Sequence, residues 1–128
     1  MDDETLKKYS PIVLRLGIAG LFLWFGLNQL FDSSSWISFL PSWTNSLPIS
    51  QNSFVLINGI FETVLGLTLL VGFATRISAL LLSLHLLGIV STLGYNDLMI
   101  RDLALSIATF TIFMNGTDEF CLEEKLKK

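Results

Sequence analysis

The chain has 128 residues, of which 52% are hydrophobic and only 15% are charged, and its formal net charge is −3. This composition excludes an ordinary soluble domain, because the charges gather at the two ends, in 1–8 and 118–128, and leave an apolar middle. A negative chain without a basic patch also excludes nucleic acid as a partner. The length allows one domain, which we predict to be a single transmembrane domain over 1–128.

The first apolar segment, about 11–31, is predicted to cross a membrane as a helix that begins at Pro11, where the missing N–H of proline is not needed. A bilayer core requires about 20 apolar residues in a helix, and this segment meets that length. It is longer than the apolar core of a signal peptide, and acidic residues precede it, so we interpret it as a permanent span.

The next segment, 32–53, carries Trp36 and Trp43 in a stretch that connects two spans. Tryptophan is typical of the headgroup layer, so we predict a short interfacial helix in this first outer loop. Two interpretations stay open: a lid above a site between the helices, or a connector that follows the membrane surface.

Three further apolar segments, about 54–73, 77–95 and 98–116, complete four predicted spans. None shows the period-two alternation of a barrel strand, so the predicted fold is all-α. With four crossings, the segments rich in Lys and Arg fall on one side, which the positive-inside rule assigns to the cytoplasm, and the other side has only Arg101, beside two aspartates. The predicted protein is therefore a multi-pass protein of the cell membrane with cytoplasmic N and C termini. The basic residues concerned are Lys7, Lys8, Arg15, Arg76, Lys125, Lys127 and Lys128.

Small and polar residues recur at helical spacing on one face of each span, which predicts an integral membrane four-helix bundle of up-down topology with these faces inward. The faces are Arg15, Ala19, Phe22, Gly26 and Gln29; Asn58, Gly59, Glu62, Thr63 and Gly66; Ser78, His85, Gly88 and Thr92; and Asp102, Ser106 and Thr109.

The rise of a helix places several polar residues in the outer third of the membrane, with Glu62 somewhat deeper. We predict that they form a ligand-binding site beneath the outer loop. The predicted site residues are Glu62, Asn58, Arg101, Asp102, Asn28, Gln29, Trp36 and Trp43.

Glu62 is the most informative of these residues. A carboxylate at this depth costs at least about 2.5–3.5 kcal/mol on insertion scales, so it requires a partner, a proton or contact with water. Three interpretations stay open: a buried ion pair with Arg101 that holds two helices together, a ligand-binding or proton-handling carboxylate, and a protonated acid.

Arg15 and His85 are predicted as polar residues of the inner half of the membrane. We interpret Arg15 as extending to the cytoplasmic interface and His85 as a hydrogen-bonded contact between helices rather than a ligand. No residues show metal-ligand spacing, and we predict no catalytic residue and no metal site. Cys121 is the only cysteine, which excludes an intrachain disulfide, and we interpret its thiol as inert rather than lipidated.

Three motifs along the chain resemble the DoxX family of small four-helix membrane proteins, which includes DoxD-like subunits. The first span contains Arg15-Leu-Gly17 and Leu-Phe-Leu-Trp24-Phe-Gly26-Leu-Asn28-Gln29-Leu30. The second contains Gly59-Ile-Phe-Glu62-Thr-Val-Leu-Gly66, which continues to Gly72-Phe-Ala-Thr75-Arg76, and the fourth contains Ile100-Arg101-Asp102. Family members often carry a lysine where this chain has Asn28 and Gln29, so the resemblance does not extend to a function that needs a positive charge there.

The resemblance implies a membrane subunit associated with a redox system, and DoxD-like relatives are linked to thiosulfate oxidation with quinone as acceptor. Our first hypothesis is therefore a DoxX-like subunit that binds a small lipophilic ligand such as a quinone, and that is at most one subunit of a quinone-linked oxidoreductase. The alternatives are a non-catalytic scaffold or assembly factor, and a small transporter or lipid-handling protein. The expected partner is the lipid bilayer, and a redox partner protein and an oligomer stay open.

Overall fold

The computed structural model describes residues 2–40, 42–93, 97–118 and 120–126, and every regular element within these ranges is a helix. The long helices are α1 (Asp3–Phe31), α2 (Gln51–Val71), α3 (Thr75–Leu93) and α4 (Asp97–Asn115). Two short 3₁₀ helices, η1 (Ser33–Phe39) and η2 (Ser42–Ser46), lie between α1 and α2, and α5 (Leu122–Leu126) follows α4. The all-α prediction is confirmed.

The start of α1 differs from the prediction. Asp2 caps this helix, because its carboxylate accepts a hydrogen bond of 2.9 Å from the N–H of Thr5. Asp3 and Glu4 in the first turn favour the same start, since acidic side chains interact well with a helix N-terminus. Pro11 therefore lies inside the helix, and the prediction that the helix begins there is wrong.

Capping residues mark both ends of α2. The hydroxyl of Ser50 caps its first turn by accepting from the N–H of Ser53, at 3.1 Å. At its other end Gly72 adopts the left-handed conformation, with φ 79°, and Phe73 donates back to the carbonyl of Thr68 at 2.9 Å. Helices α2, α3 and α4 begin and end within one to three residues of the predicted segments, and residues 94 and 95 of the third segment lie outside the described residues.

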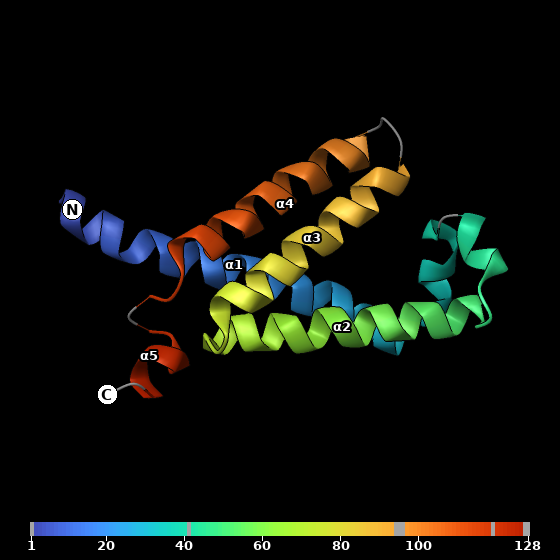
Figure 1. The fold of residues 1–128 in the computed structure, drawn as a ribbon, viewed down its shortest axis with the longest axis horizontal. Coiled ribbons are helices and arrows are strands. Elements are labelled where there is room, and N and C mark those ends of the chain that lie inside the picture. The colour runs from blue at the N-terminus through green and yellow to red at the C-terminus, as the bar shows by residue number, and fades with distance from the viewer. Residues whose placement is uncertain (1, 41, 94–96, 119, 127–128) are drawn as a thin grey trace.

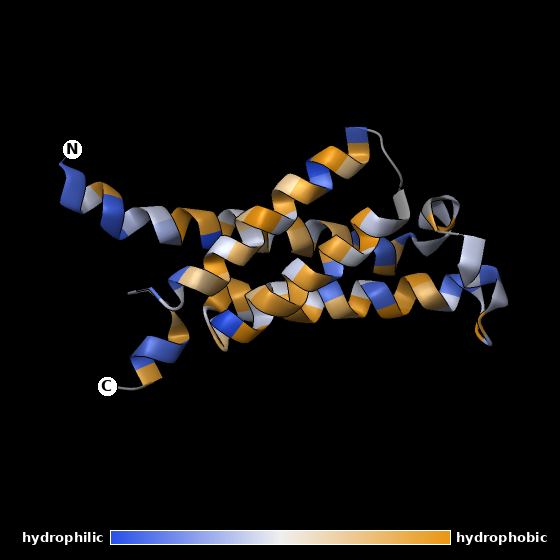
Figure 2. Ribbon diagram, turned by 45° about the horizontal axis from the view of Figure 1, so that its top comes forward, coloured by the Kyte–Doolittle hydropathy of each residue, from blue (hydrophilic) through white to orange (hydrophobic). Residues whose placement is uncertain are grey.

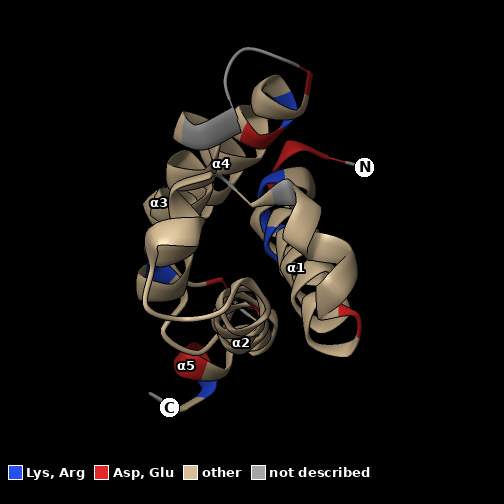
Figure 3. Cartoon of the chain, turned by 90° about the vertical axis from the view of Figure 1, so that its right-hand side faces the viewer, with Lys and Arg blue, Asp and Glu red and all other residues tan. Residues whose placement is uncertain are grey.

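Much of the long helices is apolar and uncharged (Figures 2 and 3). By length and composition α1 and α2 could each cross a membrane, and α3 contains a shorter apolar stretch, Thr75–Ser91. Large apolar side chains are exposed on all four long helices, among them Val13, Ile57, Ile77 and Ile107, at 58–69%. The outward faces are therefore those of a membrane-like protein.

The long helices form two hairpins, because α1 packs mainly along α2 and α3 mainly along α4 (Figure 1). The N-terminus, the turn between α2 and α3, and α5 lie at one end, which we call the terminal end. The opposite end, which we call the loop end, carries η1 and η2. The hairpins lie closest toward the terminal end and diverge toward the loop end (Figure 1).

Each predicted inward face contributes to the interior. All five residues on the α1 face are buried, as are Gly59, Glu62 and Gly66 on α2. Ser78, Ser106 and Thr109 are also buried, whereas Gly88 is exposed and the side chain of Thr92 is not among those described. Apolar residues from all four helices complete the core: Ile18, Phe22, Leu69, Leu82 and Ile112.

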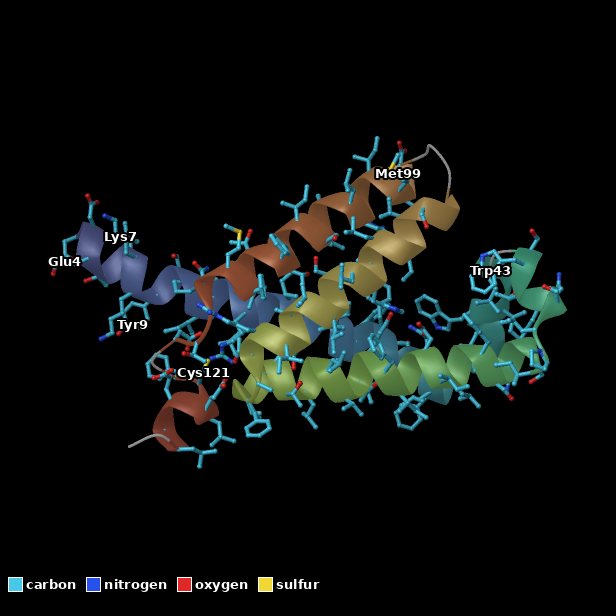
Figure 4. All side chains as sticks on the ribbon, in the orientation of Figure 1. Glu4, Lys7, Tyr9, Trp43, Met99 and Cys121 are labelled. Atoms are coloured by element: carbon cyan, nitrogen blue, oxygen red, sulfur yellow. The ribbon has the colours of Figure 1, made fainter. Side chains whose placement is uncertain are left out.

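The segment after α4 folds back over the turn between α2 and α3. The backbone N–H of Glu123 donates to the carbonyl of Gly72 at 3.1 Å, and its carboxylate accepts from the N–H of Thr75 at 3.2 Å. Cys121 belongs to this segment, and it is fully buried (Figure 4). This burial supports the interpretation of its thiol as inert, because a lipid group would have no space there.

Candidate functional site

A cavity of about 570 Å³ lies between the two hairpins. Aromatic and aliphatic side chains form most of its wall, and every long helix contributes. Its lining residues include Phe22, Phe25 and Gln29 of α1; Trp36, Leu40 and Trp43 of the loop; Phe54, Val55, Asn58 and Glu62 of α2; His85, Leu86 and Ile89 of α3; and Leu98, Arg101, Asp102 and Leu105 of α4.

Glu62 is the centre of a polar cluster in this cavity, formed by Gln29, Asn58, Glu62 and His85. Its side chain is 6% exposed. One carboxylate oxygen accepts from Gln29 Nε2 at 3.0 Å, and the other lies 3.2 Å from both Asn58 Nδ2 and His85 Nε2. Asn58 also donates to Gln29 Oε1 at 2.7 Å. Side chains from three helices therefore meet at one carboxylate.

Local sequence explains how two of these helices come together. Asn58 and Glu62 are four residues apart, so they lie one above the other on a single face of α2. A Cβ atom built on Gly59 would lie 3.0 Å from the Cβ of Gln29, and one on Gly26 would lie 2.8 Å from the backbone nitrogen of Thr63. These glycines let α1 approach α2 closely enough for Gln29 to reach the carboxylate.

Of the three interpretations of Glu62, the buried ion pair with Arg101 is wrong. Arg101 is 60% exposed, and its Nε lies 3.7 Å from Asp102 Oδ1 on the same helix. Both residues line the cavity on its α4 side. Because the hairpins diverge toward the loop end, the amides and the imidazole of nearer helices bond Glu62 instead.

The prediction that His85 is a hydrogen-bonded helix contact is confirmed by its approach to Glu62. His85 was not predicted as part of the ligand site, whereas the structure brings it into the same cluster as Gln29 and Asn58. Its ring also packs against Phe61 of α2, with ring centroids 4.9 Å apart. The spacing within α3 identifies its inward face, but not the height at which that face meets α2.

Two tryptophans line the cavity from η1 and η2. The ring of Trp36 packs edge-on against Phe25, and that of Trp43 packs edge-on against Phe54, with centroids 5.6 and 5.9 Å apart. The expected single interfacial helix is thus two 3₁₀ helices held against α1 and α2, with Trp43 at the loop end (Figure 4). Asn28 does not line the cavity, and its amide donates to the carbonyl of Trp24 in its own helix at 2.7 Å.

Arg15 does not extend to the interface, and that interpretation is wrong. It is 2% exposed, and its Nε donates to Asp118 at 2.8 Å while Nη1 donates to the carbonyls of Leu69 and Leu70. Burial raises the pKa of Asp118, but the hydrogen bond and the charge of Arg15 outweigh burial, and the net pKa is lowered. Asp118 was not among the predicted site residues, and its only signal in the sequence was an arginine on the inward face of α1 for which no partner was predicted.

Comparison with known families places these residues in context. The DoxX family model matches residues 10–94, which are 85 of the 128 residues. The match includes the whole Glu62 cluster and both lining tryptophans, and it ends before Arg101 and Asp102. Comparisons with curated proteins and with solved structures gave no match. Since the family model covers more than half of the chain, this protein belongs to the DoxX family.

Proposed function

We propose that the cavity binds a small lipophilic ligand, such as a quinone, in a membrane subunit associated with a redox system. The observation that carries this proposal is a mostly apolar cavity of about 570 Å³, lined by aliphatic and aromatic side chains, with one polar cluster in its wall. Small-molecule sites are typically concave, mostly apolar and supplied with a few polar groups that fix the orientation of the ligand. A quinone has this combination of a flat apolar ring and polar oxygens.

The proposed subunit crosses the bilayer four times, with the terminal end in the cytoplasm and the loop end outside. Basic residues support this orientation, because Lys7, Lys8, Arg76 and Lys125 lie at or near the terminal end and η1 and η2 contain none. The cavity then opens within the outer half of the membrane, where a lipophilic ligand is concentrated. Electrons pass through the diffusible ligand or a partner protein.

One observation favours a second candidate, a non-catalytic scaffold or assembly factor. Both oxygens of Glu62 are already bonded by protein groups, so its carboxylate needs no ligand as a partner. Under this second candidate, the sole role of the cluster is to hold α1, α2 and α3 together. Substitution of residues that line the cavity distinguishes the two candidate functions.

Tryptophan fluorescence provides the test, with decylubiquinone as the probe in lipid nanodiscs. Trp24 is 59% exposed and does not line the cavity, so Trp24→Phe removes the reporter that faces away from it. Quenching of Trp36 and Trp43 should then saturate. We expect Asn58→Ala or Glu62→Gln to abolish the saturable component. Thr111→Ala is the matched control, because its exposed hydroxyl bonds only within α4.

Linear quenching that does not saturate and is unchanged in Asn58→Ala would mean that the quinone only partitions into lipid. That outcome contradicts ligand binding and favours the scaffold. Mass spectrometry of the lipids and quinones that copurify in mild detergent supplies an independent measurement.

A further inference from the structure

Among the residues that the structure describes, one ring nitrogen of His85 has a hydrogen-bond partner and the other has none. Its Nε2 lies 3.2 Å from Glu62 Oε1, whereas no residue that the structure describes bonds its Nδ1. The side chain is 20% exposed and lines the cavity. Its Nδ1 can therefore still form a hydrogen bond with a group inside the cavity.

The hydrogen bonds of the other cluster members indicate that Nε2 of His85 carries a proton. Gln29 and Asn58 donate amide N–H groups to the carboxylate of Glu62, which accepts from both. An accepting carboxylate also requires a proton on Nε2 of His85. The ring is then either neutral with the proton on Nε2 or a doubly protonated imidazolium. The two states differ only at Nδ1, which is an acceptor in the first and a donor in the second.

We propose that Nδ1 of His85 binds the polar head of the ligand, and that Glu62, Gln29 and Asn58 are its positioning residues. This inference rests on the proposed function. A quinone carbonyl can only accept a hydrogen bond, so it pairs with the imidazolium and binds together with one proton from solution. A quinol hydroxyl can donate to the neutral ring or accept from the imidazolium, so it binds either state.

Few other ionisable groups face this ring. From α2 the cavity receives Glu62, and from α4 it receives Arg101 and Asp102. The described lining residues of α1, η1 and η2, which include Gln29, Trp36 and Trp43, carry no ionisable group. A pH dependence of binding therefore has three alternative sources, and each can be removed by substitution.

The experiment measures dissociation constants between pH 5.5 and 8.5 with the Trp24→Phe protein in nanodiscs. Decylubiquinone is titrated directly, and decylubiquinol by its displacement of the quinone under anaerobic conditions. With one linked proton, the Kd of the quinone should rise by a factor that approaches about ten per pH unit once His85 is neutral. The Kd of the quinol should change much less.

His85→Gln keeps an amide that can donate to Glu62 but does not titrate, so the slope for the quinone should disappear. Asp102→Asn should keep the slope, whatever its effect on the affinity itself. Saturable binding without a slope, or a slope retained in His85→Gln, would overturn the role of His85 and leave the proposed function intact. An absence of saturable quenching at every pH would refute both.

A second measurement needs no substitution, because His85 is the only histidine of the chain. With a purification tag that lacks histidine, the ring ¹⁵N resonances report its titration in the native protein. Saturating decylubiquinone should move the midpoint of this titration to higher pH and shift the Nδ1 resonance. An unchanged midpoint would contradict the inference even if His85→Gln did not fold.

Discussion

Arg15 and Asp118 form a buried pair although 103 positions separate them in the sequence. Asp118→Asn keeps the shape of the side chain but removes the charge that Arg15 contacts. Since a hydrogen bond to a charged group contributes about 1.5–3 kcal/mol, we expect a loss of that size in the free energy of unfolding. Denaturant unfolding in mild detergent measures it. Glu4→Gln is the control, because Glu4 is exposed on the first turn of α1 (Figure 4).

The same pair predicts a pH dependence of stability. The pKa of Asp118 is lower in the folded protein than its ordinary value of 3.8. Its contribution is therefore fully present above that value, where the folded state binds fewer protons than the unfolded state, and it is lost as the pH falls through the folded pKa. The stability difference between wild type and Asp118→Asn should shrink below about pH 4. A difference that stays constant between pH 7 and pH 3 would show that the ion pair is not its origin.

At the scale of elements, glycine determines how closely α1 approaches α2. In Gly26→Ala the added methyl group would lie 2.8 Å from the backbone nitrogen of Thr63, so the helices must separate. We expect a loss of about 1–3 kcal/mol, the usual cost of overpacking, together with weaker ligand binding because Gln29 moves from Glu62. Gly20→Ala is the matched control, since nothing lies within 4 Å of its added Cβ. Equal thermal stability of the two variants would refute the close-contact argument.

The elements also show what the sequence predicts and what it does not. Apolar length located all four long helices, and helical spacing identified the inward face of α1, including Gln29. Spacing along one helix does not determine the angle between two hairpins, however. That angle brings His85 to Glu62, whereas Arg101 pairs with Asp102 of its own helix. The partners of Glu62 could therefore not be predicted. The extension of α1 before Pro11 was missed because apolar length says nothing about a polar, well-capped turn.

For the whole molecule, the proposed orientation predicts which positions an impermeant maleimide can reach in intact cells. In a Cys121→Ser background, Asn45→Cys in η2 should react, because this position is exposed at the loop end. Lys125→Cys, exposed in α5, should react only after the cells are permeabilised.

Reaction at position 125 in intact cells, without reaction at 45, would reverse the orientation. Reaction at both positions would place the two ends of the molecule on the same side and contradict the three crossings, by α2, α3 and α4, that the proposal places between them. Native Cys121 cannot replace these reporters. It is fully buried, so a lack of labelling in intact cells would not show on which side of the membrane it lies.

The pairing of Arg15 with Asp118 also has a consequence for biosynthesis. The ribosome makes the guanidinium early and its carboxylate 103 residues later, after every helix that lines the cavity. A nascent chain therefore inserts its first helix while this cation still lacks its anion. Folding of the segment after α4 over Gly72 completes the pair, so the terminal end closes only after all four long helices have been synthesised.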